Sequence, residues 1–292
     1  MGYPNQALAL NPPHFSEPKL IRHRSYPASH PRRRTCFRLI LSLTLLFLFV
    51  SPFSLAPADN LLLEELFYRV DVLGWPKAVG AKITFVSLGK GRYRSEISGE
   101  AQGLLRLLTG NWRGRFITDM EYLDGRLRPV IYREEGHSWG KQHLYEYRFS
   151  YERRMLELYK GREDRGLVKE WEAPLEKPIY DLWSALYNLR LGLCGPLQSG
   201  ETLSFTGIPY PKPEEISFAF GSFGPDGRKV MISLMNRIFG DEHNCLFVYF
   251  NRDEVPTSGW TRILQFGKVT WKLLPESRVL EKGRFIQEQG KG

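Results

Sequence analysis

Hydrophobic and polar residues alternate along most of the chain after residue 59, a pattern typical of half-buried β-strands. The runs 66–72 and 81–86 alternate in this way, so each places one face inward and one outward. Asp124-Gly125 and Pro225-Asp226-Gly227 separate pairs of such runs and predict tight turns between antiparallel strands. Further strands are predicted over 92–99, 116–122, 127–132, 143–150, 153–159, 202–208, 216–220, 230–234, 245–251 and 260–274.

One segment has the period of a helix. Leu182, Ala185, Leu186 and Leu189 form a single apolar stripe, which Asp181 can cap and which Gly192 and Gly195-Pro196 can end. Many short strands must close or curl around a covering element to protect their edges. We therefore predict a mainly β fold, an antiparallel curved sheet or barrel-like structure with one amphipathic helix packed on it.

The polar side of this helix holds the weak ligand-binding candidates of the chain. Trp183, Tyr187 and Arg190 lie opposite the apolar stripe, beside Asn188. A helix in the mouth of a curved sheet could present these side chains to a ligand. The alternative is that the helix only plugs the sheet, which is the commoner arrangement.

An apolar run at residues 39–50 follows Arg32, Arg33, Arg34 and Arg38 and precedes Ala56-Pro57-Ala58. Positive charge, a short apolar segment and small residues predict a cleavable signal peptide over 32–58. The alternative is a short inner-membrane anchor, although the run is shorter than the roughly 20 residues that span a bilayer. Residues 1–31 read as an unstructured extension or a start codon placed too early, and 59–292 as a single β-rich domain.

The leader also accounts for much of the positive charge. Residues 1–58 hold seven of the 41 Lys and Arg residues and one of the 32 Asp and Glu residues, which leaves 34 against 31 and a formal charge of +3. Nucleic-acid binding requires several phosphates to be neutralised together. Nucleic acid is therefore not expected as a partner.

The signal segment predicts the periplasm of a Gram-negative bacterium as the location of the protein. Contact with the membrane is expected only through the signal or anchor segment.

Three stretches resemble one protein family. The helix residues Asp181, Ser184, Tyr187 and Arg190 are similar to the Asp-x-x-Ser-x-x-Tyr-x-x-Arg helix of the bacterial domain of unknown function 3108 family. Residues 246–256 with 266–274 resemble its closing strands, and residues 68–74 its opening strand. The resemblance covers about 65 to 275. It implies an exported, mainly antiparallel β protein of the Gram-negative envelope, with no established activity and no catalytic residues to carry over.

The common catalytic and metal-binding patterns are not found in the sequence. His137 and His143 lack a standard metal-ligand spacing, so neither a metal site nor a cofactor is predicted. No Gly-x-Ser-x-Gly elbow occurs, and we assign no catalytic residue. Asp181 and Asp253 are explained as a helix cap and a turn former.

Cys194 and Cys245 are the cysteines left after signal cleavage and are candidates for a disulfide in an oxidising compartment. The alternative is two separate buried thiols.

Two classes of function follow. The first is a non-catalytic binding or envelope-assembly protein whose sheet forms a cavity for an apolar or amphipathic ligand, with lipid or another envelope component as partner. The second is an envelope hydrolase. A purely structural partner protein is a further alternative that the sequence does not separate from the first.

Overall fold

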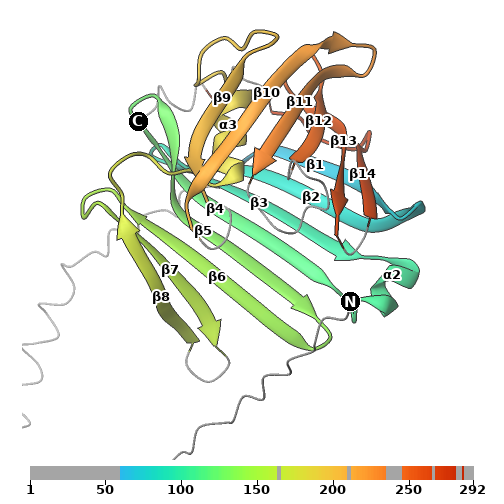
Figure 1. The fold of residues 1–292 in the computed structure, drawn as a ribbon, viewed down its shortest axis with the longest axis horizontal. Coiled ribbons are helices and arrows are strands. Elements are labelled where there is room, and N and C mark those ends of the chain that lie inside the picture. The colour runs from blue at the N-terminus through green and yellow to red at the C-terminus, as the bar shows by residue number, and fades with distance from the viewer. Residues whose placement is uncertain are drawn as a thin grey trace, which may run out of the picture. The chain divides into compact units, whose positions relative to one another are not determined.

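Figure 1 shows the fold in a computed structural model, which describes residues 60–162, 166–208, 212–234, 245–264, 267–280 and 285. These residues all lie within one compact unit, Leu55–Gly292. The predicted signal peptide and the extension before it lie outside the described residues. Within the described ranges, no helix combines the length and the hydrophobicity needed to span a membrane.

Fourteen strands form one antiparallel sheet, which confirms the predicted fold class. Strands that follow one another in sequence pair in the sheet, except β8 and β9, which form its two edges. Strand β1 also pairs with β14, so the order is β8 to β1, then β14 to β9. The strands are β1 Leu61–Val72, β2 Trp75–Gly89, β3 Arg92–Ala101, β4 Arg113–Leu123, β5 Arg126–Ser138, β6 Lys141–Ser150, β7 Met155–Arg162, β8 Gly166–Pro174, β9 Thr202–Gly207, β10 Glu214–Gly224, β11 Gly227–Leu234, β12 Cys245–Phe250, β13 Pro256–Ile263 and β14 Gly267–Leu273.

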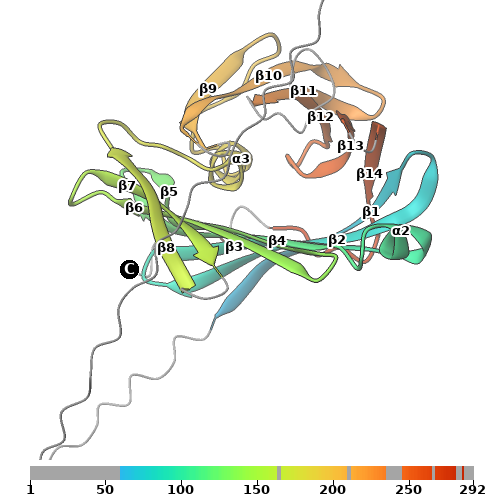
Figure 2. The same ribbon diagram turned by 60° about the horizontal axis from the view of Figure 1, so that its bottom comes forward.

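The described residues contain two helices, α2 Gly103–Leu108 and α3 Leu182–Arg190. The predicted helix is α3, and its residues Leu186 and Leu189 pack with Phe218 and Ile232 of β10 and β11. Its opposite side contacts the first strands, where the Tyr187 ring stacks on Phe85 of β2 at 4.2 Å between centroids. The sheet has two parts, β1 to β8 and β9 to β14, which are joined where β1 pairs with β14. Figure 2 shows α3 between these two parts of the sheet.

The structure differs from the predicted elements in three places. Helix α2 lies in the connection between β3 and β4, for which no element was predicted, and β8 was not predicted because its exposed face is strongly charged. Residues 260–274 belong to two strands, β13 and β14, with Leu264 in the turn between them. Short elements at an edge or a connection carry too few periodic positions to be read from the sequence.

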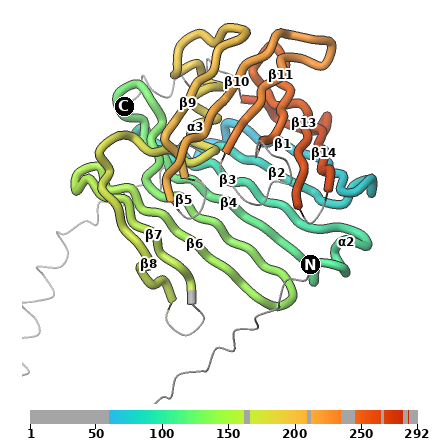
Figure 3. The backbone as a smooth tube through the Cα atoms, viewed as in Figure 1, coloured from blue at the N-terminus to red at the C-terminus, as the bar shows by residue number. Residues whose placement is uncertain are grey.

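The antiparallel strands run between two ends of the sheet, as the tube in Figure 3 shows. We call one the α2 end: it contains α2 and the β1–β2, β5–β6 and β13–β14 turns. We call the other the Asp124 end: it contains the β2–β3, β4–β5 and β12–β13 turns.

Candidate functional site

A buried ion pair holds the last turn of α3 against β1 near the Asp124 end. The Arg190 guanidinium donates from Nη1 and Nη2 to the two carboxylate oxygens of Glu64, each at 2.6 Å. The Tyr187 hydroxyl donates to Glu64 Oε1 at 2.8 Å, and the Leu280 backbone N–H donates to Oε2 at 3.1 Å. Glu64 is 0% and Arg190 5% exposed, so both charges are removed from water as a fully hydrogen-bonded set.

The electrostatics of this set follow from its burial. Burial lowers the pKa of Arg190, but the adjacent Glu64 carboxylate outweighs it and leaves that pKa raised. Burial, with the same carboxylate, raises the pKa of the Tyr187 phenol. Arg190 also donates from Nε to the Glu254 carbonyl at 2.9 Å, which ties α3 to the β12–β13 turn. The pair bonds to protein groups of β1, α3 and the β12–β13 turn, and removing either partner would leave a buried charge unpaired.

The first turn of α3 is held in a similar way. Asp181 Oδ1 accepts hydrogen bonds from the backbone N–H groups of Trp183 at 2.9 Å and Ser184 at 3.2 Å, while Ser184 Oγ accepts from Asp181 N–H, which completes a capping box. Thr118 Oγ1 donates to the same carboxylate at 2.9 Å. Burial raises the pKa of Asp181, against the lowering effect of these bonds. The predicted cap is thereby confirmed.

The structure separates the three candidates on α3. Tyr187 and Arg190 lie together in the buried set around Glu64, and Asn188 donates to the Leu127 carbonyl at 2.7 Å. Trp183, one turn earlier, lines a cavity between the two parts of the sheet. Only Trp183 therefore lies where a molecule held by the sheet could touch it.

That cavity is the strongest candidate site, with a volume of about 420 Å³. Its walls come from the inner faces of β1 to β4, from α3, and from β11 to β14. They are lined almost entirely by apolar side chains, which include Val70, Ile83, Ile97, Phe116, Leu182, Leu186, Ile232, Val248, Ile263 and Trp271. The cavity is walled by residues far apart in sequence, so it exists only in the folded sheet.

The two hydroxyls in the lining are already used within the protein. Tyr68 donates to the Pro256 carbonyl at 2.7 Å, and Thr261 donates to the Cys245 carbonyl at 2.9 Å. Burial raises the pKa of Tyr68, so its phenol stays protonated. The lining thus offers carbon surface, which favours an apolar ligand over a charged one.

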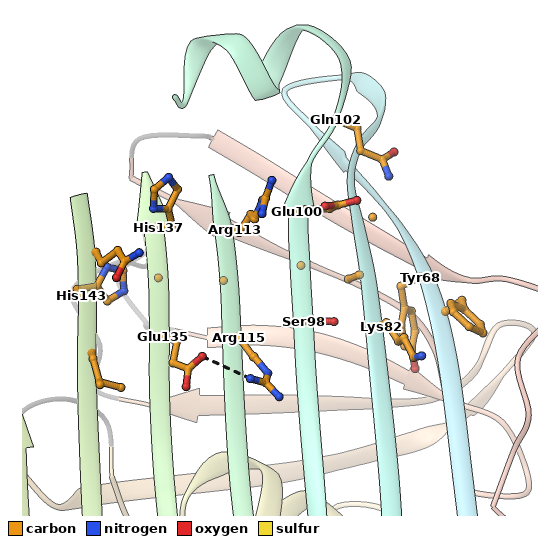
Figure 4. Close-up of a pocket in the computed structure, with 18 of the residues that line it drawn as sticks. Tyr68, Lys82, Ser98, Glu100, Gln102, Arg113, Arg115, Glu135, His137 and His143 are labelled. Atoms are coloured by element: carbon orange, nitrogen blue, oxygen red, sulfur yellow. Dashed lines mark ion pairs between the residues drawn. The ribbon is translucent and has the colours of Figure 1, made fainter. Parts of the chain in front are cut away.

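A second, wider groove of about 770 Å³ crosses the outer face of β2 to β6 (Figure 4). Two rows of polar side chains border it: Ser98, Arg115 and Glu135 in one, and Glu100, Arg113 and His137 in the other. Arg115 donates two hydrogen bonds to Glu96, each at 2.7 Å, and lies 3.6 Å from Glu135. The Arg115 hydrogen bond lowers the pKa of Glu96. Opposite charges paired on an open face contribute little energy.

His137 and His143 lie on opposite faces of the sheet. His137 pairs with Arg113 and Gln142 in the outer rows, whereas the His143 ring covers Gly136 on the inner face. In the part of the chain that the structure describes, no group of three or more His, Cys, Asp or Glu side chains could hold a metal ion. These two histidines are therefore not brought together.

The two cysteines lie on different elements. Cys194 is half-buried in the loop after α3, and Cys245 is buried at the start of β12. No disulfide joins them in the structure. Burial raises the pKa of the Cys194 thiol, which lowers its reactivity as a thiolate. Pairing of the two sulfurs stays a prediction. Thiol labelling of denatured, unreduced protein tests it, because paired sulfurs would not be labelled.

Glu64 and the cavity lining other than Trp183 were not predicted. Glu64 did carry a signal, because it shares the inward parity of Leu66 and Tyr68 in a strand whose other inward positions are apolar. An acidic residue at such a position requires a buried cationic partner. The cavity residues carried no such signal, since core and cavity positions have the same hydrophobic pattern.

Comparison with known proteins finds one similar solved structure and one family. The crystal structure of the beta-barrel-like protein of domain of unknown function DUF1849 from Brucella abortus is similar at 10% identity and a TM-score of 0.44, over 74% of this chain and 97% of that one. Among proteins with curated descriptions, none matches. The family described as "Protein of unknown function (DUF3108)" matches residues 68–220, just over half of the chain. The chain belongs to the DUF3108 family.

Proposed function

We propose that this chain is a non-catalytic binding protein of the cell envelope, whose cavity holds an apolar or amphipathic molecule such as a lipid acyl chain. The observation that carries the proposal is the 420 Å³ cavity lined by carbon surface. Its volume falls within the range of about 300–1,000 Å³ that is usual for ligand sites. Each methylene that moves from water into it would stabilise the complex by about 0.8 kcal/mol.

The envelope location rests on separate support. The charged, apolar and small-residue segments of 32–58 follow the order of an export signal. Export would bring the β-rich domain to the periplasm, an aqueous compartment in which a lipid acyl chain needs shielding from water. A retained segment would instead anchor the same domain to the inner membrane. N-terminal sequencing of protein recovered from the periplasm, with an Asp59 start as the expected result, separates these outcomes.

Ligand binding is tested on protein produced with its own leader and purified from the envelope. Native mass spectrometry is expected to find a co-purifying lipid, or a complex after a long-chain fatty acid is added. Ala81→Phe fills the cavity from β2 and is expected to weaken fatty-acid binding at least tenfold. Ala219→Phe makes the same change on β10, outside the cavity lining, and is expected to bind like the wild type.

The proposal would be wrong if the wild type carried no ligand and bound no added fatty acid. It would also be wrong if Ala81→Phe and Ala219→Phe bound equally well. Thermal unfolding of both variants shows whether either result reflects loss of the fold.

A further inference from the structure

Exposed large apolar side chains gather at the α2 end. Seven of the ten in the described part of the chain lie there: Leu73, Trp75, Leu104, Leu107, Leu108, Trp139 and Leu264. Leu107, Leu264 and Trp139 are 70%, 69% and 67% exposed. Helix α2 buries only Leu105, so its remaining leucines face solvent. Exposed apolar side chains gathered at one end of a folded domain indicate an interaction site.

Hydrogen bonds join these turns into one surface. Leu73 N–H donates to the Lys268 carbonyl at 3.2 Å, which connects the β1–β2 turn to β14. Gln102 N–H donates to the Ala78 carbonyl at 2.8 Å, which connects α2 to β2. Trp139 N–H donates to the Gly110 carbonyl at 3.0 Å, which connects the β5–β6 turn to the end of α2. Figure 1 shows α2 between these turns.

Two turns at the α2 end carry bulky apolar residues at positions where the backbone disfavours them. Leu73-Gly74 and Trp139-Gly140 at the α2 end have positive φ at both residues, as Lys90-Gly91 and Asp124-Gly125 have at the other end. Such turns favour Asn or Asp at the first position, because a branched or bulky side chain is strained at positive φ. Leucine and tryptophan occupy that position only at the α2 end, which points to a role outside folding.

Positive charge accompanies the apolar side chains. Lys77, Arg106, Lys141 and Lys268 are exposed in or beside the same turns. The described residues of these connections, 73–77, 103–111, 138–141, 264 and 267–268, include no acidic residue. Asp71, Glu100 and Glu135 are the nearest carboxylates along the adjoining strands, and Asp71 accepts from Lys77 N–H. The end therefore combines apolar tips with excess positive charge.

We propose that the α2 end docks on the surface of an anionic phospholipid bilayer, with its leucines and tryptophans inserted among the lipid headgroups. A bilayer satisfies both features at once, since it offers acyl chains to the apolar tips and phosphates to the cations. Tryptophan is also enriched at this depth of membranes. Separate protruding turns fit a deformable lipid surface, whereas a protein partner would need a complementary pocket for each.

The cavity lies behind this surface. Ile263 of the lining directly precedes Leu264, and Val70 and Ile263 pack with Leu105 of α2 in one apolar cluster. Docking would thus bring the cavity close to the lipid from which a ligand would enter. Membrane docking does not depend on ligand binding, and the two are tested separately below.

The test is co-sedimentation of the envelope-purified protein with vesicles of phosphatidylcholine alone or of phosphatidylcholine with phosphatidylglycerol. The wild type is expected to bind the phosphatidylglycerol vesicles more tightly, and to lose binding as salt is added. Leu104→Ser with Leu107→Ser changes two exposed side chains and is expected to weaken binding about tenfold or more. The matched control is Leu123→Ser with Phe223→Ser at the Asp124 end, which is expected to bind like the wild type.

Equal binding by the two double variants, or no vesicle binding by the wild type, would overturn the proposal. If Leu104→Ser with Leu107→Ser instead changed only self-association in sedimentation velocity, the surface would be a contact between copies of the chain. Ala81→Phe is expected to sediment with vesicles like the wild type, so a failure of ligand binding is distinguishable from a failure of docking. Circular dichroism melting confirms that each variant is folded.

Discussion

The two ends of the sheet share strands and turn geometry but differ in what they bury and what they expose. Near the Asp124 end the interior holds the Glu64–Arg190 pair with its hydrogen bonds from Tyr187 and Leu280, and the turns carry Lys90 and Asp124. Near the α2 end the interior holds an apolar cavity, and the turns carry Leu73 and Trp139. The Asp124 end buries its polar groups in hydrogen bonds, whereas the α2 end leaves apolar side chains exposed to solvent.

Strand β1 shows the division within one element. Glu64, near its start, is fully buried in the ionic set, whereas Tyr68 and Val70 line the cavity further along. The inward face of β1 therefore changes from a hydrogen-bonded polar residue at its start to apolar residues that line an open cavity further along. A binding protein needs both, because a site that is left partly empty costs packing energy that the remaining core must offset.

The largest expected effect comes from breaking the buried pair. Arg190→Met leaves the Glu64 carboxylate in the interior without its cation, and we expect a loss of about 3–5 kcal/mol in the free energy of unfolding. Urea denaturation followed by tryptophan fluorescence measures this loss.

The control is an exposed pair of the same chemistry. Arg115→Met removes the cation beside Glu96 on the outer face, and a loss within about 1 kcal/mol is expected. Equal losses in the two variants would mean that the Asp124 end does not hold the stability assigned to it.

The next effect concerns charge at the α2 end. Lys77→Glu with Lys141→Glu reverses two exposed charges beside the apolar tips, and each cation near an anionic surface contributes about 1 kcal/mol. Binding to phosphatidylglycerol vesicles should fall more than tenfold in co-sedimentation. Lys90→Glu with Arg252→Glu makes the same change in turns of the Asp124 end and should leave binding unchanged. Similar losses for both pairs would show that overall charge, not position, decides binding.

A smaller effect is expected from exchanging the turn residues. Leu73→Asn places a residue that tolerates positive φ in the β1–β2 turn, and should raise the free energy of unfolding by about 1 kcal/mol while weakening vesicle binding. Asp124→Leu makes the reverse change, removes the 2.6 Å ion pair with Arg128, and should lower stability by about 1 kcal/mol. Thermal unfolding measures both changes in stability. A less stable Leu73→Asn variant or a more stable Asp124→Leu variant would contradict the argument that Leu73 is strained at the α2 end.

The smallest effect tests the interior between the two ends. Glu134 pairs with Phe116 of the cavity lining, and burial raises its pKa although the Tyr132 hydroxyl donates to it at 2.9 Å. Its folded pKa exceeds its unfolded pKa, so the stability it contributes is greatest at low pH and is lost as pH rises through the folded value.

Glu134→Gln should therefore slightly raise stability at neutral pH and flatten its dependence between acid and neutral pH, measured as melting temperature against pH. Glu96→Gln is the contrasting control: the lowered pKa of Glu96 gives stability above its unfolded value that is lost as pH falls. A wild-type slope retained in Glu134→Gln would show that this part of the inner face is hydrated.

The predicted elements that were confirmed share long, regular patterns. The alternation over 66–72 and 81–86 became β1 and β2, and the stripe from Leu182 to Leu189 became α3 with its Asp181 cap. Helix α2 was not predicted because its six residues carry too few periodic positions to distinguish a helix from a turn.

The helix that carried the family resemblance teaches a related lesson. Asp181 and Ser184 form the capping box, and Tyr187 and Arg190 bind Glu64. Each of the four residues thus has a partner inside the fold. A motif of polar residues on a helix can therefore form hydrogen bonds within the folded protein and need not mark a ligand site.

The sequence by itself determined most of the local structure of this protein: the strands with long alternation, the capped helix, two tight turns and the family resemblance. These depend on periodicity and on backbone preferences that act over a few residues. Only the tertiary structure decided which residues share the cavity, that Glu64 faces Arg190, and that Leu73, Leu107, Trp139 and Leu264 lie at one end. Pairing β1 with β14 brings the two parts of the chain together, and side chains that meet across such a distance leave no periodic mark in the sequence.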